Sequence, residues 1–492
     1  MNLATVHSRA QNGIQAPAVQ IESHLGGGLP SFSIVGLPET AVKESKDRVR
    51  AALQVSGFEF PQRRITVNLA PADLPKTGGR FDLGIAIAIL AASGQINAGP
   101  LADHEFLGEL SLSGGVRPVR GALSAALAAR AARRALVLPG DNAAEAALVD
   151  GTTVLPVSSL LDLCAHLNGE APLAATTAAL PSSTSLSNGD INEVRGQYHA
   201  KRALEIAAAG GHSLLMFGPP GTGKTMLATR LPGLLPPLSE AEAIETAAVA
   251  SISDKGLDIQ RWRQRPFRAP HHTASGVALV GGGSTPKPGE VSLAHNGILF
   301  LDELPEFDRK VLEVLREPLE NGHITISRAA QQAEFPARFQ LIAAMNPCPR
   351  GDDCSPEEEQ RYRQRLSEPF LDRIDMMVEL PRIDQHELQK ADRGEDSATV
   401  RDRVMGAHAI QTARQGTMNS RLGPRDVDTH CPLSPPEQQL LARAVERLGL
   451  SARAYHRVLR LARTIADLGG AERIGMEALS EALTYRRGPW RS

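Results

Sequence analysis

Aromatic residues and cysteines are scarce in this chain of 492 residues. Aromatic side chains make up 4% of it, so platforms on which single-stranded bases could stack cannot be numerous. The chain has four cysteines, Cys164, Cys348, Cys354 and Cys431, too few for a disulfide framework at this length. These shortages exclude a disulfide-stapled scaffold and an extended stacking surface.

The chain also lacks a strong net charge and a long apolar run. Its 53 basic and 55 acidic residues leave a formal charge of −2, so any nucleic-acid surface must be local. No run approaches the roughly 18 apolar residues of a membrane span. The opening residues, MNLATVHSRAQNG, lack a charged-then-apolar signal pattern. We therefore expect a cytoplasmic protein without a membrane partner.

The length predicts two to four domains. Residues 1–168 alternate strand-like and helical patterns. Strands are expected at 31–35, 64–69, 135–138 and 153–157, and helices at 39–56, 81–93 and 122–134. Residues 169–190 are small and polar without periodicity, which predicts a linker.

A second unit is expected over 191–383. Its continuous apolar runs at 214–217, 297–301 and 339–344 are typical of parallel strands covered on both faces. Residues 384–430 are polar and are assigned as a connecting segment. Residues 431–492 have helical patterns, with one apolar face over 451–468, and are assigned as a helical lid.

One motif carries most of the functional information. Residues 218–225 have the pattern G-x-x-x-x-G-K-[ST], between the apolar run 214–217 and a predicted helix at 226–231. The glycines let successive N–H groups face phosphate oxygens, while Lys224 reaches the β- and γ-phosphates and Thr225 ligates Mg²⁺. The loop consists of Gly218, Pro219, Pro220, Gly221, Thr222, Gly223, Lys224 and Thr225. The motif predicts a nucleoside triphosphate with Mg²⁺.

Polar residues end the two later apolar runs of this unit. Asp302 and Glu303 follow one run, and Asn346 follows the other; the carboxyl ends of parallel strands are where such sheets place ligand chemistry. We expect Asp302 to hold Mg²⁺ through water, Glu303 to polarise the attacking water, and Asn346 to orient that water or sense the γ-phosphate. Taken alone, Asn346 before a proline is equally consistent with a turn.

The order of these motifs resembles AAA+ ATPases. After the phosphate loop, the acidic pair and the asparagine come Leu-Asp-Arg-Ile-Asp at 371–375 and Ser-Ala-Arg at 451–453. The resemblance implies an α/β fold, a P-loop NTPase doubly wound sheet with a helical lid, and ATP as the nucleotide. It also implies that Arg373 is a finger for the neighbouring subunit's site and that Arg453 is a second sensor on the lid. Bare sequence favours a surface salt bridge for each arginine.

Three further segments narrow the resemblance to the magnesium-chelatase-like branch: 267–275, 281–283 and 288–297. Nearly the whole chain is similar to the ComM/YifB family of competence-associated helicases. This resemblance implies a homo-oligomer, a hexamer, that moves DNA and promotes branch migration of recombination junctions during natural transformation. The alternative is a magnesium-chelatase-like remodelling ATPase that acts on a protein partner.

The N-terminal residues resemble the Lon-protease-like domain, with the ribosomal protein S5-like α+β fold. The matching segments are 75–84 and 108–116. In this comparison Asp82 occupies the position of the serine nucleophile and Ser124 lies near that of the lysine base. A carboxylate and a hydroxyl cannot replace this pair, so we expect an inactive protease fold with a role in assembly or DNA contact.

Arginines mark candidate DNA contacts. The segment RWRQRPFR brings together basic and aromatic side chains, a combination that suits phosphates and bases. A second segment resembles a hairpin inserted before the sensor strand. The candidates are Arg261, Arg263, Arg265, Arg268, Arg328 and Arg338. A solvated basic face or a subunit contact is the alternative.

Two potential metal sites are not predicted as such. Relatives carry two cysteine pairs after the sensor asparagine, a spacing that suits zinc. Here only Cys348 and Cys354 stand in that stretch, and we predict two free thiols in a turn and no zinc. Adjacent histidines such as His271 and His272 point apart in regular structure, so we expect them to position a loop or to pack in a polar core, and not to bind a metal.

Overall fold

The computed structural model describes residues 2–177, 189–283, 286–327, 332–348, 354–383 and 394–486. These residues form two compact units. The N-terminal unit contains the described residues up to 177 together with 240–262 and 332–335, and the C-terminal unit contains the others. None of the helices in the described ranges has the length and apolar content that crossing a bilayer requires.

A mixed seven-stranded sheet organises the N-terminal unit, with strand order β3-β4-β2-β1-β5-β8-β9. Strand β2 pairs antiparallel with β1 and β4, whereas the other neighbours pair in parallel. The strands assigned to this unit, of which β6, β7 and β16 lie outside the seven-stranded sheet, are β1 (Leu3–Arg9), β2 (Ala18–Gly26), β3 (Ser31–Val35), β4 (Arg64–Ala70), β5 (His104–Phe106), β6 (Glu109–Leu110), β7 (Val116–Arg117), β8 (Ala135–Pro139), β9 (Val154–Val157) and β16 (Gln332–Pro336). The helices are α1 (Thr40–Lys43), α2 (Ser45–Val55), α3 (Asp82–Ala92), α4 (Ala122–Ala132), α5 (Gly140–Ala146), α6 (Leu160–Leu167) and α9 (Glu240–Ser251).

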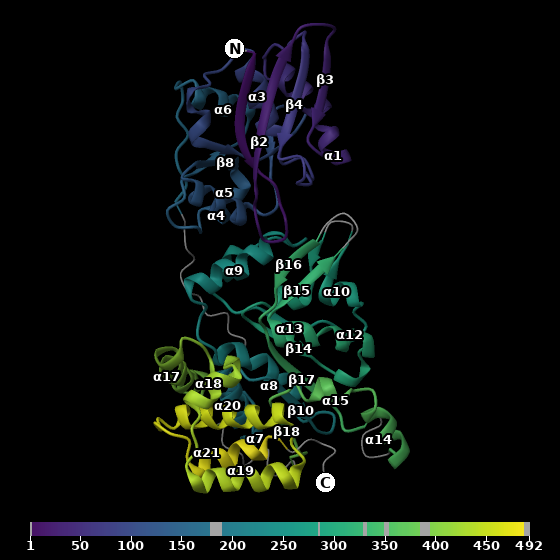
Figure 1. Cartoon of the computed structure of the whole chain (residues 1–492), viewed down its shortest axis with the longest axis vertical. Helices are drawn as coiled ribbons and strands as arrows, with labels where there is room; N and C mark the ends of the chain where they lie inside the picture. Colours follow the sequence, from purple (N-terminus) through teal and green to yellow (C-terminus); the bar gives the residue numbers. More distant parts are fainter. Residues whose placement is uncertain are drawn as a thin grey trace. The chain divides into compact units, whose positions relative to one another are not determined.

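Helix α3 is the centre of this unit's core. Every residue from Asp82 to Ala92 is buried, and the helix packs against β1 and β2 (Figure 1). The predicted strands and the helices at 81–93 and 122–134 are confirmed. The predicted helix 39–56 is instead two helices that meet at Glu44, a break that places the buried Ser45 where its hydroxyl donates to Asp82.

Residues 240–262 belong to the N-terminal unit although the sequence assigned them to the ATPase core. Ala247 and Ala248 of α9 are buried in the cluster formed by α4, α5, β8 and β9. The N–H of Gly121 donates to the carbonyl of Ser251 over 3.3 Å. This apolar contact explains the grouping, because alanines spaced along a helix leave a flat face that can approach the small residues of α4 closely.

A five-stranded parallel sheet organises the C-terminal unit, with strand order β11-β14-β17-β10-β18. The strands of the unit are β10 (Leu214–Phe217), β11 (Phe267–Arg268), β12 (Gly281–Gly282), β13 (Lys287–Pro288), β14 (Ile298–Leu301), β15 (His323–Ser327), β17 (Gln340–Met345) and β18 (Met376–Glu379). The parallel α/β sheet predicted from the apolar runs is confirmed.

Alternate residues of the central strands pack into two different cores. In β10, Leu214 and Met216 join one cluster, while Leu215 and Phe217 join the other. The same alternation continues in β14 and β17. Because successive side chains of a strand point to opposite faces, a sheet covered on both sides needs continuous apolar strands, which is the pattern seen in the sequence.

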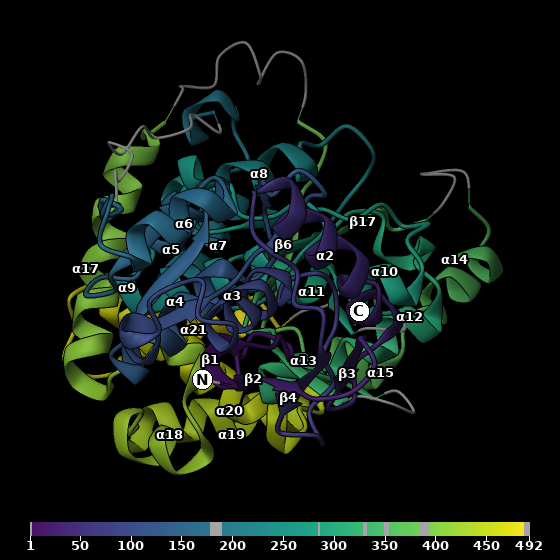
Figure 2. The same ribbon diagram turned by 90° about the horizontal axis from the view of Figure 1, so that it is seen from above.

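Helices cover both faces of this sheet. They are α7 (Tyr198–Gly210), α8 (Lys224–Arg230), α10 (Gly276–Val280), α11 (Glu290–Leu293), α12 (Arg309–Val314), α13 (Arg316–Asn321), α14 (Pro356–Arg363), α15 (Glu368–Leu371), α17 (Ser397–Gln415), α18 (Pro424–His430), α19 (Pro435–Leu448), α20 (Ala452–Leu468) and α21 (Met476–Thr484). Helices α17 to α21 form the lid, in which α20 contacts α17, α18 and α21 (Figure 1, Figure 2).

The lid begins earlier in the chain than the sequence indicated. Helices α17 and α18 lie within residues 384–430, which were assigned as a connecting segment. The buried residues of α17 are few, and they include Val400, Val404 and Ala407. Such a narrow apolar stripe on an otherwise polar helix is a weak signal.

Candidate active site

The phosphate-binding loop joins β10 to α8 at the carboxyl edge of the parallel sheet. Gly218 begins the loop so close to the next strand that a Cβ there would lie 2.2 Å from the carbonyl oxygen of Leu380. Gly223, with φ of +92°, makes the turn into α8 in a conformation that favours glycine. These two glycines are required by the path of the loop, as the motif predicted.

Lys224 connects the loop to the neighbouring strand. Its Nζ donates to the carbonyls of Gly218 and Pro219, over 2.7 and 2.8 Å, and to Oδ1 of Asn346 over 3.0 Å. Burial lowers the pKa of this amino group, and the carboxylate of Asp302 opposes the shift. The structure therefore brings Lys224 and Asn346 together from segments 122 residues apart.

Asp302 faces the hydroxyl that follows the lysine. Thr225 Oγ1 donates to Asp302 Oδ2 over 2.7 Å. A hydroxyl and a carboxylate oxygen at this separation are the hard oxygen ligands that Mg²⁺ prefers. This pair would hold Mg²⁺, which neutralises phosphate charge when bound.

Glu303 stands beside the acidic strand end in a left-handed conformation, with φ of +53°. Its Oε2 lies 3.1 Å from Nδ1 of His272. The His272 ring also packs edge-on against Phe307, with ring centroids 6.5 Å apart. His272 thus contacts the side chain that the sequence assigned as the catalytic base. The centroids of the His271 and His272 rings lie 4.1 Å apart, so the expectation that the two side chains point apart is wrong, because residues 271–274 form a turn and not a regular element.

Gln197 is a site residue that the sequence analysis missed. It is buried, and its side-chain amide donates to the carbonyls of Thr222 and Pro381 over 3.3 and 2.8 Å. It therefore ties the phosphate loop to the end of β18. No motif marks this glutamine, because its partners are backbone atoms from distant segments.

The two predicted arginines lie at the other edge of the sheet. Arg373 precedes β18, and its carbonyl accepts from the hydroxyl of Ser213, which precedes β10. Arg373 Nη2 lies 2.6 Å from Glu320 Oε1, and Arg453 Nη2 lies 3.4 Å from the same oxygen. The amino edge of the strands therefore gathers Arg373 and Arg453, while Lys224 lies at the carboxyl edge.

A cavity of about 700 Å³ opens at this amino edge. Glu320 and Asp375 are the acidic residues of its lining. The arginines of the lining are Arg265, Arg338, Arg373, Arg421, Arg453, Arg457 and Arg460. The excess of guanidinium groups suits a polyanionic ligand. Arg265 and Arg338, which the sequence proposed as DNA contacts, thus lie beside the two predicted ATPase arginines.

The remaining DNA candidates have different surroundings. Arg268 forms a two-pronged ion pair with Glu290, at 2.5 and 2.6 Å. In the N-terminal unit, the Arg261 side chain is 68% exposed and lies 3.4 Å from Asp258. Arg263 has a positive φ of 63°. Arg328 lies outside the described residues.

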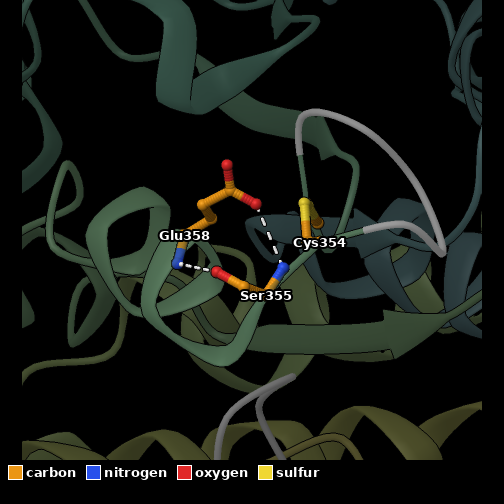
Figure 3. The surroundings of a disulfide bond; sticks show 4 residues. Cys354, Ser355 and Glu358 are labelled. Atoms are coloured by element: carbon orange, nitrogen blue, oxygen red, sulfur yellow. Dashed lines mark hydrogen bonds between the residues drawn. A yellow bond between two sulfur atoms is a disulfide. The ribbon is translucent and has the colours of Figure 1, made fainter.

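The two cysteines after the sensor asparagine are joined in a disulfide, with Cα atoms 6.4 Å apart. Figure 3 shows this bond at the start of α14, where Ser355 and Glu358 form a capping box. The prediction of two free thiols is therefore wrong, because the fold brings Cys348 and Cys354 within bonding range. Among the described residues, no three His, Cys, Asp or Glu side chains gather as a metal site.

In the N-terminal unit, Asp82 is enclosed by partners. Arg48 Nε donates to Asp82 Oδ2 over 2.6 Å, and Ser45 donates to Oδ1. The side chain of Asp82 is fully buried. Ser124 is buried too, and its hydroxyl has no hydrogen-bond partner within the described part of the chain. Asp82 is thus a structural ion-pair residue at the position where the resemblance places a nucleophile.

The phosphate loop, acidic strand end, polar Asn346 and five-stranded parallel sheet with a helical lid define a P-loop NTPase of the AAA+ class. Family models agree with this class. The description "Magnesium chelatase, subunit ChlI" matches residues 190–388, and its C-terminal counterpart matches 394–486. "Subunit ChlI of Mg-chelatase" matches residues 21–142.

Individual relatives narrow the class. The chain is 54% identical to "Competence protein ComM" of Haemophilus influenzae, over 99% of this chain and 98% of that protein. It is 52% identical to "Uncharacterized protein YifB" of Salmonella typhimurium, over 99% and 97%. The "Magnesium-chelatase 38 kDa subunit" of Cereibacter sphaeroides is 26% identical over 44% of this chain and 70% of its own length. The chain belongs to the ComM/YifB family of magnesium-chelatase-like AAA+ ATPases.

Proposed function

We propose that this protein is a ring-forming, ATP-driven DNA motor that promotes branch migration of recombination junctions during natural transformation. The printed name of the Haemophilus relative, a competence protein, supports the cellular role. The observation that carries the proposal is the division of the ATPase residues between the two edges of one sheet. Lys224 and Asp302 lie at the carboxyl edge, and Arg373 and Arg453 lie at the amino edge.

At the carboxyl edge, the chain's own groups bind and orient the triphosphate. Loop N–H groups and Lys224 bind phosphate oxygens, and Thr225 and Asp302 position the metal-binding oxygens. Glu303 accepts the proton of the attacking water, and Asn346 orients that water. His272 fixes the carboxylate of Glu303, from which it is 3.1 Å away.

Arg373 and Arg453 complete the site of an adjacent copy. Guanidinium groups stabilise the charge that develops on the transferred phosphoryl group, and such a finger is worth roughly 10³ to 10⁵ in rate. Because these arginines lie at the edge away from their own phosphate loop, a head-to-tail ring gives each loop a partner's arginines. We propose a hexamer, which mass measurement in the presence of nucleotide would establish.

The DNA contact is proposed for the exposed arginines of the segment 261–268. Arg261 and Arg263 are exposed, the Arg261 side chain to 68%, and an exposed guanidinium can pair with phosphate. Arg268 stays engaged with Glu290 and serves as an internal control. Arg261→Ala should weaken DNA stimulation, whereas an exchange at an ion-paired exposed arginine of the N-terminal unit, Arg120→Ala, should leave it unchanged.

ATP turnover with and without a forked or four-way DNA junction tests the proposal. We expect the junction to stimulate turnover and to be unwound with ATP. Lys224→Ala should stop unwinding while DNA binding persists, because the lysine acts on phosphate at the carboxyl edge. ATP turnover that is not stimulated by DNA, together with a failure to unwind the junction, would refute the proposed DNA motor.

The second candidate is a remodelling ATPase that acts on a protein partner. The matches to magnesium-chelatase subunit models favour it. Such a motor should show no DNA stimulation and should need a second protein for full turnover. The same ATPase assay therefore separates the two functions.

A further inference from the structure

One carboxylate contacts both of the arginines assigned to the neighbour's site. Glu320, at the end of α13, places the same oxygen 2.6 Å from Arg373 and 3.4 Å from Arg453. The two arginines come from segments about 80 residues apart in the chain, before β18 and in α20. Glu320 is therefore the point at which the arginine before the last strand and the arginine of the lid meet.

The exposure of the three side chains differs in a way that matters. The Arg373 side chain is 5% exposed, while those of Glu320 and Arg453 are 43% and 60% exposed. Arg373 also donates to the carbonyl of Pro369 over 2.6 Å. A guanidinium so enclosed cannot reach a phosphate on another chain unless it leaves its carboxylate.

The charges around Arg373 favour such an exchange. Burial lowers the pKa of Arg373; the positive charges of Arg316 and Arg453 lower it further, whereas Glu320 raises it. One carboxylate thus faces several cations. An incoming triphosphate carries more negative charge than Glu320 does, so it competes favourably for the same guanidinium groups.

The segment that carries Arg373 is fixed to the lid independently of Glu320. Ser451 donates to Asp372 over 3.2 Å, and Arg457 lies 2.8 Å from Asp375. These contacts stay in place when Glu320 is exchanged. A change at Glu320 therefore frees two side chains without detaching the lid helix α20 from the strand.

We propose that Glu320 is a positioning residue that holds Arg373 and Arg453 together, withdrawn in the single chain, until the triphosphate of an adjacent copy takes its place. This inference rests on the proposed function, in which both arginines act on a neighbouring site. It assigns a cost to subunit association, because the Arg373–Glu320 pair must open when the interface forms.

Glu320→Gln tests the restraint, with Glu317→Gln on the same helix as the matched control. Turnover is measured across a range of protein concentrations at saturating ATP. We expect Glu320→Gln to lower the protein concentration at half-maximal turnover by about two- to fivefold, the range of a partly exposed ion pair, with kcat at high concentration unchanged. Glu317→Gln should behave as the parent protein.

Two further variants complete the experiment. Glu320→Asp keeps the charge at a greater distance and should shift the midpoint less than Glu320→Gln does. Arg373→Ala reports on the proposed function itself. Suppose that Arg373→Ala abolishes turnover, while Glu320→Gln leaves unchanged or raises the protein concentration at half-maximal turnover. The proposed restraint by Glu320 is then refuted, and the proposed ATPase site shared between copies is not. If Arg373→Ala retains full turnover, the shared site is wrong.

Discussion

Mixing two inactive variants tests whether the ATPase site is shared between copies. Lys224→Ala removes the lysine of the phosphate loop, and Arg373→Ala removes the arginine at the opposite edge of the sheet. A mixed ring contains interfaces where the intact loop of one variant meets the intact arginine of the other. Such an interface is whole only if the arginine acts on the neighbour.

The structure sets the magnitude. The four residues of β18 at about 3.3 Å each separate the two edges of the sheet by about 13 Å, so Arg373 cannot serve its own loop without a large movement. Each variant alone should lose about 10³-fold or more in turnover. In an equimolar random mixture about a quarter of the interfaces carry both intact groups, and turnover should recover to about a quarter of the parent value.

The two proteins are first freed of bound nucleotide and mixed. Steady-state phosphate release is then measured after ATP and magnesium are added. The control is the double variant, Lys224→Ala with Arg373→Ala, mixed with Lys224→Ala, in which no interface is whole. Turnover that stays at the sum of the two separate variants, in rings shown to have exchanged subunits, would refute a shared site.

Three further predictions follow from single contacts. Burial lowers the pKa of Lys224, so its ammonium loses its proton at a lower pH than it does in the unfolded chain. As the pH is raised, the affinity for ATP should therefore begin to decrease before the ordinary lysine pKa of about 10.4 is reached. A KM for ATP that stays constant up to that pH would contradict this. His272→Ala should lower kcat about tenfold through Glu303 while KM for ATP stays within about twofold. Arg48→Met should reduce the protection of α3 against hydrogen exchange by about 3–5 kcal/mol, because the buried Asp82 loses its partner.

The controls for these variants use neighbouring residues. His271→Ala removes a ring whose centroid lies 4.1 Å from that of His272; it should lower kcat less than His272→Ala does, because among the described residues no contact joins His271 itself to Glu303. Arg48→Met combined with Asp82→Asn should recover most of the lost protection, since the buried charge is removed together with its partner. Equal loss in the single and double variants would show that Arg48 acts through packing alone.

Much of the site could be predicted because its signals are local. The phosphate loop is contiguous in sequence, and the acidic pair and Asn346 each end a continuous apolar run. Parallel strands bring their carboxyl ends to one edge, so these residues had to meet if the strands paired. The direct contact of Lys224 with Asn346, at 3.0 Å, is the consequence.

Other features had no local signal. Gln197 binds only backbone carbonyls, and α17 carries too few apolar residues to stand out. Helix α9 packs with the N-terminal residues through alanines, which are common on any helix. The disulfide between Cys348 and Cys354 had no local signal either, because two single cysteines six residues apart match no paired-cysteine motif.

The amino-acid sequence by itself determined the nucleotide chemistry, the parallel sheet and the family, because each depends on residues close together in the chain or on strand periodicity. Only the tertiary structure decided that Arg373 and Arg453 share Glu320 at the edge away from Lys224, and that Arg265 and Arg338 line the same cavity. Spacing in the sequence does not encode such proximity, because it arises from strand order and lid packing, which join segments far apart in the chain.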